Sequence, residues 1–192
     1  LAVLPPLRRY AAGRSLRVLD VGSGGGLPGA VIAIMQPEWQ VSTVDAVAKN
    51  TSTSFYGNIV TMQESPLREG LLLVGTDDGL VRITSDGGAN WTRLERFPGV
   101  PEATYVTDLE PSRFDANVIY ASFDNHQRDD FRPYLLRSDD LGKTWLSLAG
   151  DLPDCGMVHA IALDHVDPGL MFVGTEFGVF FTRDAAGHGP VR

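Results

Sequence analysis

One unit occurs three times in the C-terminal part of this 192-residue chain, and the repetition constrains the fold more than any other feature. Each copy holds a strand that ends at a Pro-containing turn, then a second short apolar strand, then a third strand. The first two copies add a fourth strand that begins at a Trp. The period of about 44 to 54 residues is that of a four-stranded β-propeller blade. The second strands are expected at 71–76, 118–122 and 170–175, and the third strands at 79–84, 134–138 and 178–182.

The most specific motif of the unit lies between its third and fourth strands and has the pattern Ser/Thr-x-Asp-x-Gly-x-x-Trp. The Asp carboxylate is expected to accept hydrogen bonds from N–H groups of its own turn, and the Gly to supply a positive φ. The Trp is expected to pack between blades. The third copy displaces the Gly by one position and has no Trp after it. The motif residues are Thr84, Asp86, Gly88 and Trp91, then Ser138, Asp140, Gly142 and Trp145, and then Asp184.

Over residues 55–187 this pattern resembles the BNR/Asp-box propellers of sialidases, sortilin-like receptors and bacterial glycoside-hydrolase-like proteins of unassigned activity. The resemblance implies that the Asp boxes are structural elements at the periphery, far from the ligand face. A sialidase would also need an arginine cluster together with a nucleophilic Tyr and a supporting Glu, and we identify no such set in the sequence. The resemblance therefore predicts a fold and assigns no catalytic residue.

A ligand site is expected where the second blade carries an insertion at 123–133, between its second and third strands, because such loops share one face of a propeller. The simplest interpretation of this insertion is a solvated loop held by Asp–Arg ion pairs. The alternative is a loop that contacts a ligand or a partner. No metal site is predicted, since one His among scattered carboxylates has no diagnostic spacing. The candidate residues are Asp124, His126, Arg128, Asp129, Asp130 and Arg132.

The first fifty residues have a different pattern. An aliphatic run at 16–22 stops at glycine and predicts a buried parallel strand, an apolar helix is expected at 30–35, and a second strand at 40–45. Glycines 22, 24 and 26 allow the backbone to turn tightly and to approach a ligand. Asp45, about 20 residues beyond this loop, stands where such folds hydrogen-bond ribose hydroxyls.

These residues resemble the glucose-inhibited-division-protein-B family, the rRNA guanine-N7 methyltransferases that use S-adenosylmethionine. The string from Asp20 through Gly22, Gly24 and Gly26 to Leu-Pro-Gly29 is the specific part. By this resemblance the string would hold the methionine moiety of the cofactor and Asp45 its ribose. The resemblance is expected to stop at Lys49, where a Ser/Thr-rich linker follows, so that the adenine pocket and the RNA-binding surface are missing. The segment is therefore interpreted as a methyltransferase remnant that needs no cofactor.

The predicted fold class is mainly β: a partial β-propeller of about two and a half four-stranded antiparallel blades, preceded by a small α/β Rossmann-like fragment. The predicted domains are the fragment at 1–50, a linker at 51–56 and blades at 57–105, 106–159 and 160–192. The preferred function is that of a non-catalytic interaction module. The alternatives are an S-adenosylmethionine-dependent rRNA methyltransferase-type protein and a carbohydrate-binding or glycoside-hydrolase-like protein.

Charge and composition limit the partners. Residues 1–50 carry a net charge of +2 and the remaining residues a net charge of −10, so nucleic-acid binding by the second part is not expected. No apolar run reaches the roughly 20 residues that cross a bilayer. The chain has one cysteine, Cys155, which can form no internal disulfide. This slightly favours a cytoplasmic location, although the sequence does not decide the compartment. Because open blades leave unpaired strand edges and apolar faces, we expect the chain to self-associate. The sequence leaves open whether its ligand is a protein or a glycan.

Overall fold

The computed structural model describes residues 14–21, 40–44 and 57–185 of the chain, which divides into two compact units at 1–47 and 48–192. The first unit contains β1 (Arg17–Val21) and β2 (Gln40–Val44), which pair in parallel with Val21 opposite Val44. Both strands lie where the aliphatic runs predict them. The helix expected at 30–35 and the linker expected at 51–56 lie outside the described residues, so the structure shows two parallel strands here and does not show a Rossmann-like α/β fragment.

The second unit is built from three antiparallel sheets in which consecutive strands pair with one another. The first sheet contains β3 (Ile59–Glu64), β4 (Leu72–Thr76), β5 (Val81–Thr84) and β6 (Thr92–Leu94). The second contains β7 (Tyr105–Pro111), β8 (Ile119–Asn125), β9 (Asp130–Ser138) and β10 (Leu146–Ser147). The third contains β11 (Val158–Leu163), β12 (Met171–Thr175) and β13 (Gly178–Thr182). The described residues are thus mainly β, as the repeat predicts.

Backbone geometry repeats from sheet to sheet as closely as the sequence does. In each sheet the register between the first two strands shifts after the same position, at Ile59, Val106 and Val158. The turn between these strands is closed each time by an equivalent pair of backbone hydrogen bonds; the bonds at the start of the turn run from Ser65 to Leu71, from Ser112 to Val118 and from Asp164 to Leu170. Local sequence therefore sets the same first hairpin three times.

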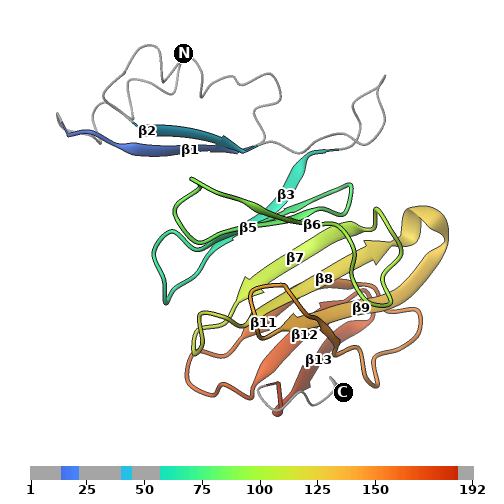
Figure 1. The fold of residues 1–192 in the computed structure, drawn as a ribbon. Coiled ribbons are helices and arrows are strands. Elements are labelled where there is room, and N and C mark those ends of the chain that lie inside the picture. The colour runs from blue at the N-terminus through green and yellow to red at the C-terminus, as the bar shows by residue number, and fades with distance from the viewer. Residues whose placement is uncertain (1–13, 22–39, 45–56, 186–192) are drawn as a thin grey trace. The chain divides into compact units, whose positions relative to one another are not determined.

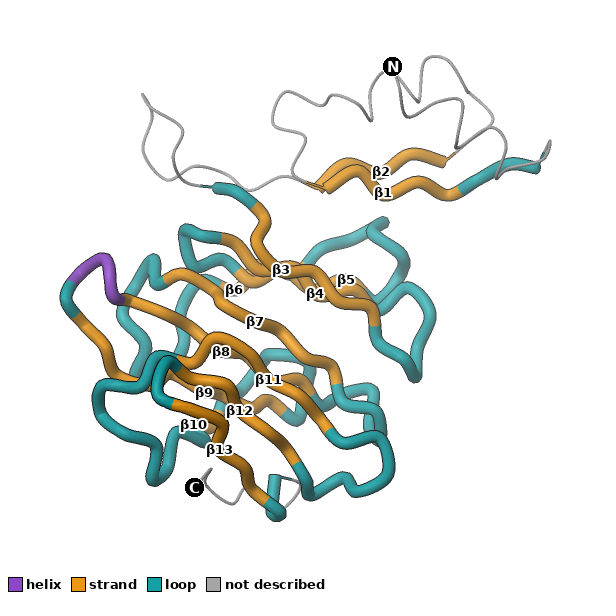
Figure 2. The backbone as a smooth tube through the Cα atoms, turned by 180° about the vertical axis from the view of Figure 1, so that it is seen from behind, coloured by secondary structure: helices purple, strands orange, loops and turns teal. Residues whose placement is uncertain are grey.

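The three sheets lie in series and pack face to face in chain order (Figures 1 and 2). Their first strands adjoin, since β7 lies beside both β3 and β11. Two bonds join β7 to β11: the Thr107 hydroxyl donates to the carbonyl of Val158 at 2.7 Å, and the Asp108 carboxylate accepts from the amide of Ile161 at 2.8 Å. The stack thus has its first strands on one side, as in a propeller whose blades surround an axis.

The second sheet is buried on both faces. Alternate residues of β8 point in opposite directions, so Ile119, Ala121 and Phe123 join the core shared with the first sheet. Val118, which precedes the strand, and Tyr120 join the core shared with the third sheet. All seven residues of β8 are consequently buried. Hydrophobic burial between sheets, rather than within one sheet, stabilises this unit.

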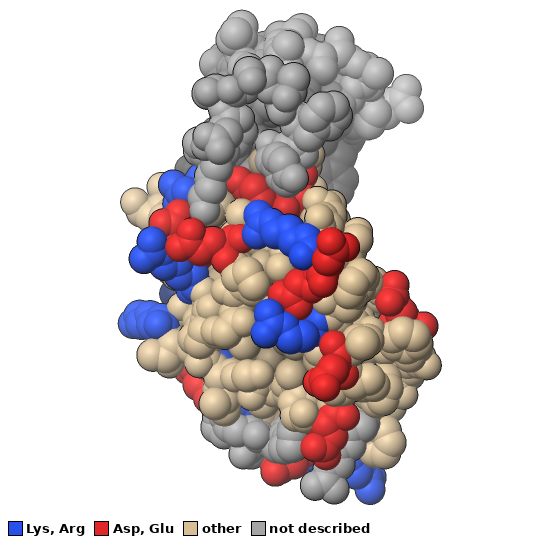
Figure 3. Space-filling view, turned by 90° about the vertical axis from the view of Figure 1, so that its right-hand side faces the viewer, with Lys and Arg blue, Asp and Glu red and all other residues tan. Residues whose placement is uncertain are grey.

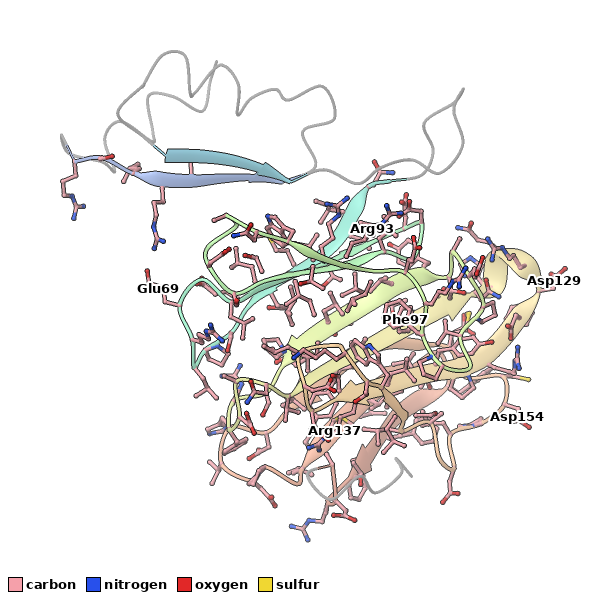
Figure 4. All side chains as sticks on the ribbon, in the orientation of Figure 1. Glu69, Arg93, Phe97, Asp129, Arg137 and Asp154 are labelled. Carbon is pink, nitrogen blue, oxygen red and sulfur yellow. The ribbon has the colours of Figure 1, made fainter. Side chains whose placement is uncertain are left out.

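The interface between the first two sheets has its aromatic centre at Phe97, which follows β6. Its ring lies 4.7 Å from that of Phe123 and 5.5 Å from that of Trp145, between centroids. Figure 4 shows Phe97 in the interior between the sheets. In the part of the chain that the structure describes, the one helix is a 3-10 turn at His126–Arg128, and no helix there is long and apolar enough to cross a membrane.

A matched pair of glycines tests this stacking. A Cβ atom added to Gly75 in β4 would lie 2.6 Å from Cγ1 of Val106 in the next sheet and 2.7 Å from Cγ2 of Thr61 in β3, whereas one added to the equivalent Gly174 in β12 would meet only Ala160, at 3.8 Å or more. We expect Gly75→Ala to lower the free energy of unfolding by about 1–3 kcal/mol through overpacking. Gly174→Ala should leave it unchanged or raise it by up to about 1 kcal/mol. Urea unfolding of both variants measures the difference, and equal effects would contradict the stacking.

Candidate functional site

The first Asp box is a closed network of hydrogen bonds around two side chains. The Thr84 hydroxyl donates to Oδ1 of Asp86 at 2.7 Å and accepts from the amide of Gly88 at 3.0 Å. The Asp86 carboxylate also accepts from the amide and from the side chain of Asn90, at 2.9 and 2.7 Å. The indole of Trp91 donates to the carbonyl of Gly88 at 3.1 Å.

The second Asp box has the same network with different residue types. The Ser138 hydroxyl donates to Asp140 at 2.8 Å and accepts from the amide of Gly142 at 2.8 Å. Asp140 accepts from the amide and from the hydroxyl of Thr144, at 2.8 and 2.7 Å, and the Trp145 indole donates to Gly142 at 2.9 Å. Gly142 has φ +84°, and a Cβ there would lie 2.5 Å from Cδ1 of Leu94 in the first sheet. The second box therefore packs directly against the preceding sheet.

The third copy retains part of the box. The amide of Asp184 donates to the Thr182 hydroxyl at 3.1 Å, and the next residue, Ala185, is fully buried. Arg137 of the second sheet donates to the carbonyl of Ala185. In all three copies the residue after the box Asp donates its amide to the turn between the first two strands: Gly87 to Gly70, Leu141 to Asn117 and Ala185 to Gly169. All three motifs therefore lie at the same end of the sheets as these turns.

Electrostatics of the two complete boxes agree with their geometry. The pKa of Asp86 is lowered to about 2, because the amide and side chain of Asn90 and then the Thr84 hydroxyl donate to its carboxylate. The pKa of Asp140 is lowered to about 2 by the corresponding bonds from Thr144 and Ser138. Both carboxylates are thus held in the ionised form by groups within their own hairpin.

A small hollow lies at the opposite end of the sheets, where connections from the first two sheets meet. Consecutive strands pair within each sheet, so the chain reverses direction at alternate ends of the sheet. The Asp boxes lie at one end. At the other end lie the hairpins between second and third strands and the connections from one sheet to the next. Three segments contribute residues to the hollow: the β4–β5 hairpin, the connection to β7 and the β8–β9 hairpin. We call it the polar hollow; beside the backbone at Ala103 its lining residues are Asp77, Tyr105, Asp124, Asn125, Gln127 and Arg128.

Two carboxylates on the polar hollow are fixed in position by neighbouring donors. Asp77 accepts from the amides of Gly57 and Asn58, at 2.6 and 2.9 Å, and from the Asn58 side chain at 2.8 Å. Asp124 is buried and accepts from the amide of His126 at 2.8 Å and pairs with its Nδ1 at 2.6 Å. These carboxylates therefore order the loops that form the hollow.

Neutral and cationic groups complete the polar hollow. Burial raises the pKa of Tyr105, and the carboxylates of Asp77 and Asp124 raise it further, so its phenol stays protonated at neutral pH. Arg128 reaches across to the preceding connection and donates to the carbonyl of Glu102 at 2.6 Å. The hollow thus combines carboxylates, amides, a phenol and one guanidinium, which are groups that hydrogen-bond polar ligands.

The predicted loop at 123–133 is largely a strand extension. Asn125 pairs with Asp130 across the hairpin, so β9 begins at Asp130, four residues before the expected start of the third strand. Only the 3-10 turn and Asp129, which has φ +58°, lie between the strands. Figure 4 shows Asp129 at the tip of the hairpin.

Asp130 and Arg132 form an ion pair within β9. The guanidinium donates to both carboxylate oxygens at 2.8 and 2.9 Å, and the Tyr134 hydroxyl donates to Asp130 at 2.5 Å. The bonds from Arg132 and then Tyr134 lower the pKa of Asp130, although burial opposes this, while burial and the bond to Asp130 raise the pKa of Tyr134 to about 12. Neither charged group of the pair lines the polar hollow.

The structure therefore divides the predicted loop residues. Asp124 and Arg128 line the polar hollow, whereas His126, Asp129, Asp130 and Arg132 do not. Asp77, Tyr105, Asn125 and Gln127 were not among the predicted residues. A sequence signal exists for Asp77 alone, since Asp77, Asp124 and Glu176 occupy equivalent positions in the three copies, directly after Thr76, Phe123 and Thr175.

The charged surface on this side of the molecule is mixed. Figure 3 shows acidic and basic side chains interleaved across it, without a patch of one sign. Within the residues that the structure describes, no group of three or more His, Cys, Asp or Glu side chains is arranged to hold a metal ion.

The predicted cofactor residues lie in or beside the first unit. Asp20 is the fourth residue of β1, and Gly22, Gly24, Gly26 and Asp45 lie outside the described residues. β1 and β2 are parallel and end opposite each other, so Gly22 and Asp45 directly follow two adjacent strand ends.

Comparison with known proteins separates the two parts of the chain. Residues 3–62 match the family model of rRNA small subunit methyltransferase G. Ribosomal RNA small subunit methyltransferase G of Leptothrix cholodnii and that of Bordetella avium are each 58% identical, over 52 and 53 residues, which is 27% of this chain. The chain spans about a quarter of the length of these relatives, 24% in each case. The family match passes Lys49, where the resemblance was expected to stop, and enters β3.

Among solved structures, the chain is similar to an ancestral GH74 enzyme, with a TM-score of 0.53 and 18% identity over 70% of this chain and 18% of that one. It is also similar to YCF48 bound to D1 peptide, with a TM-score of 0.50 and 19% identity over 74% of this chain and 44% of that one. At this identity the likeness shows the fold alone, and that fold is the β-propeller. The chain thus combines a methyltransferase-type segment with propeller blades.

The Asp boxes predict a dependence of stability on pH. The folded-state pKa values of Asp86 and Asp140 lie near 2, below the ordinary value of 3.8. Their contribution to stability is therefore complete above pH 4 and is lost as the pH falls towards 2. We expect the double variant Asp86→Asn/Asp140→Asn to show a smaller loss of stability than the unaltered chain over this interval, in urea unfolding followed by tryptophan fluorescence at constant salt.

The control for this experiment is Asp154→Asn, which changes an exposed carboxyl group outside both boxes. It should retain the pH dependence of the unaltered chain. Identical pH profiles for all three proteins would show that the boxes do not contribute in this way.

Proposed function

We propose that the propeller part of this chain is a non-catalytic binding module that holds an oligosaccharide or a similar polyhydroxylated ligand at the polar hollow. The observation that carries the proposal is the convergence of hydrogen-bonding side chains from three separate connections on one place. They come from the β4–β5 hairpin, the start of β7 and the β8–β9 hairpin. Binding sites built from loops on a rigid support have this arrangement.

The sheets supply the rigid support. β8, which leads into the hollow, is buried along its whole length, and Phe123 lies in the core directly before Asp124. The Asp boxes stabilise the far end of the same sheets, which leaves the hollow end to the ligand. Because buried strands already hold the side chains of the hollow in place, these side chains lose little conformational entropy when a ligand binds.

The chemistry of the lining favours hydroxyl groups as the recognised feature. A carboxylate group has about four acceptor sites in all, of which Asp124 uses two and Asp77 uses three within the chain. The amides of Asn125 and Gln127 both donate and accept, as sugar hydroxyls do. The carboxylates act here as positioned acceptors, since Asp77 also accepts from residues 57 and 58 and Asp124 also accepts from the turn at His126. This assignment requires no proton transfer.

Gln127 offers the sharpest test of this proposal, because it lines the hollow and forms no part of the loop-ordering bonds described above. In a glycan array followed by titration of the strongest glycan, we expect Gln127→Ala to weaken binding about tenfold, the cost of one lost hydrogen bond. Asp129→Asn, at the tip of the same hairpin and outside the hollow, should bind as the unaltered chain does. The proposal fails if no glycan binds or if both variants bind normally.

A second candidate function is S-adenosylmethionine binding by the first unit. It is favoured by the family match over residues 3–62 and by the parallel pairing of β1 with β2. Val21 and Val44, which precede Gly22 and Asp45 in the chain, pair with each other at the carboxyl ends of the two parallel strands. Folds of this kind bind nucleotide cofactors at the carboxyl ends of their strands. Gly22, Gly24 and Gly26 would then hold the methionine part, Asp20 would support the loop, and Asp45 would accept from the ribose hydroxyls. Only binding is proposed, because the chain spans a quarter of its methyltransferase relatives.

Isothermal titration calorimetry with S-adenosylmethionine tests the second candidate. The unaltered chain should bind the cofactor, and Asp45→Ala should weaken binding at least about tenfold through loss of the bonds to ribose. Asp154→Asn, in the propeller part, should bind normally. Absence of binding by the unaltered chain would leave the methyltransferase-type segment without this activity.

A further inference from the structure

We propose that the saccharide recognised at the polar hollow is an amino sugar, whose protonated amino group enters the hollow while neighbouring hydroxyl groups bind at its rim. The inference rests on the proposed function and names the chemical class of its ligand. The hollow has a volume of about 80 Å³, which is room for a few groups of the size of a water molecule. A single substituent of a saccharide therefore fills it, and the innermost lining selects that substituent.

The buried part of the lining presents hydrogen-bond acceptors. Asp124 and Asn125 are 7 and 6% exposed, whereas Gln127 and Arg128 are exposed and form the rim. The Asn125 side chain turns its amide nitrogen towards Asp130, outside the lining, and donates to it at 3.2 Å. Its oxygen remains an acceptor for a ligand. The interior of the hollow is thus lined by a carboxylate and an amide oxygen, and the groups that donate most freely lie at the rim.

An ammonium group fits such an interior better than a hydroxyl group does. It has three N–H donors and no acceptor, whereas a hydroxyl group brings a single donor together with acceptors. Asp77 and Asp124 both keep unused acceptor sites after their bonds within the chain. Together with the oxygen of Asn125 they supply the several acceptors that one ammonium group needs.

Negative charge is also concentrated at the hollow. Burial raises the pKa of Tyr105, and the charges of Asp77 and Asp124 raise it further, so their field extends across the lining. Asp78 directly follows Asp77 and is 2% exposed, and its Oδ2 has no hydrogen-bond partner within the described residues. A cation bound between these side chains is attracted by carboxylates of both hairpins.

Two basic side chains lie near these carboxylates, and neither occupies the interior. Arg128 is the cation among the lining residues, but it is exposed to solvent and its Nη1 donates to the carbonyl of Glu102 at 2.6 Å. His126 pairs with Asp124 through Nδ1, is half exposed and is not part of the lining. Solvent weakens the repulsion from exposed charges more than the attraction of buried ones, so the interior still favours a cation.

The test compares three tetrasaccharides that share one skeleton and differ at one substituent. Cellotetraose has a hydroxyl group at C2 of each ring, the N-acetylglucosamine tetramer has a neutral amide there, and the deacetylated tetramer has an amino group. Isothermal titration calorimetry of the full chain is carried out at about pH 7, where a primary amine is largely protonated. Salt of about 0.15 M screens long-range attraction to the net charge of −8. We expect the deacetylated tetramer to bind at least about tenfold more tightly than either neutral one.

Two variants with the same change of net charge separate the hollow from the rest of the surface. Asp77→Asn and Asp129→Asn each remove one negative charge, and only Asp77 lines the hollow. We expect Asp77→Asn to lower the preference for the deacetylated tetramer over cellotetraose at least about fivefold, whereas Asp129→Asn retains that preference. Gln127→Glu adds a carboxylate at the rim and should raise it. Circular dichroism and the Tm verify that each variant remains folded.

Failure of this inference differs from failure of the proposed function. If the neutral tetramers bind as tightly as the deacetylated one, the amino sugar is wrong and a polyhydroxylated ligand stands. If none of the three binds, the amino sugar is again overturned, and the glycan array decides the proposed function separately. Equal losses of preference in Asp77→Asn and Asp129→Asn would also overturn the inference. So would binding of Nα-acetyl-lysine amide, an ammonium group without a sugar, as tightly as the deacetylated tetramer.

Discussion

Packing of one sheet face against the next is the interaction on which this structure depends. Each sheet has short strands with apolar residues on both faces, so it needs a neighbour on each side to bury them. The second sheet has both neighbours, and β8 is buried from end to end. Within the described residues, the third sheet has the same alternation of residues and packs against the second sheet.

Side-chain hydrogen bonds have different roles at the two ends of the sheets. At one end the Asp boxes use the Asp86 and Asp140 carboxylates within single hairpins, and an amide from each of the three motifs bonds to the first turn of its own sheet. At the other end the carboxylates of Asp77 and Asp124 order connections that belong to different sheets, and a hollow forms between them. The Asp boxes and the polar hollow thereby lie at opposite ends of the same strands, which lets the lining of the hollow vary without loss of the boxes.

The two parts of the chain meet within a short stretch. The methyltransferase-type match extends to residue 62 and so includes the first four residues of β3, while the propeller fold begins with that strand. Residues 59–62 are thus common to the family match and to the first sheet. Ile59 and Val60 are β-branched and have the high strand propensity that suits β3, in which they lie.

Sequence by itself determined the features that depend on residues close together in the chain: the strands, the first turns, the box motif and the mainly β class. Thr84 and Asp86, for example, are two residues apart, and their bond needs no other part of the protein. Tertiary structure alone decided that Asp77, Tyr105 and Gln127 share a hollow, that Asp130 pairs with Arg132 away from it, and that β9 begins at Asp130. The physical reason is that these features arise from contacts between sheets and from strand pairing at the tip of a hairpin, and residue type at one position does not specify which distant surface will reach it.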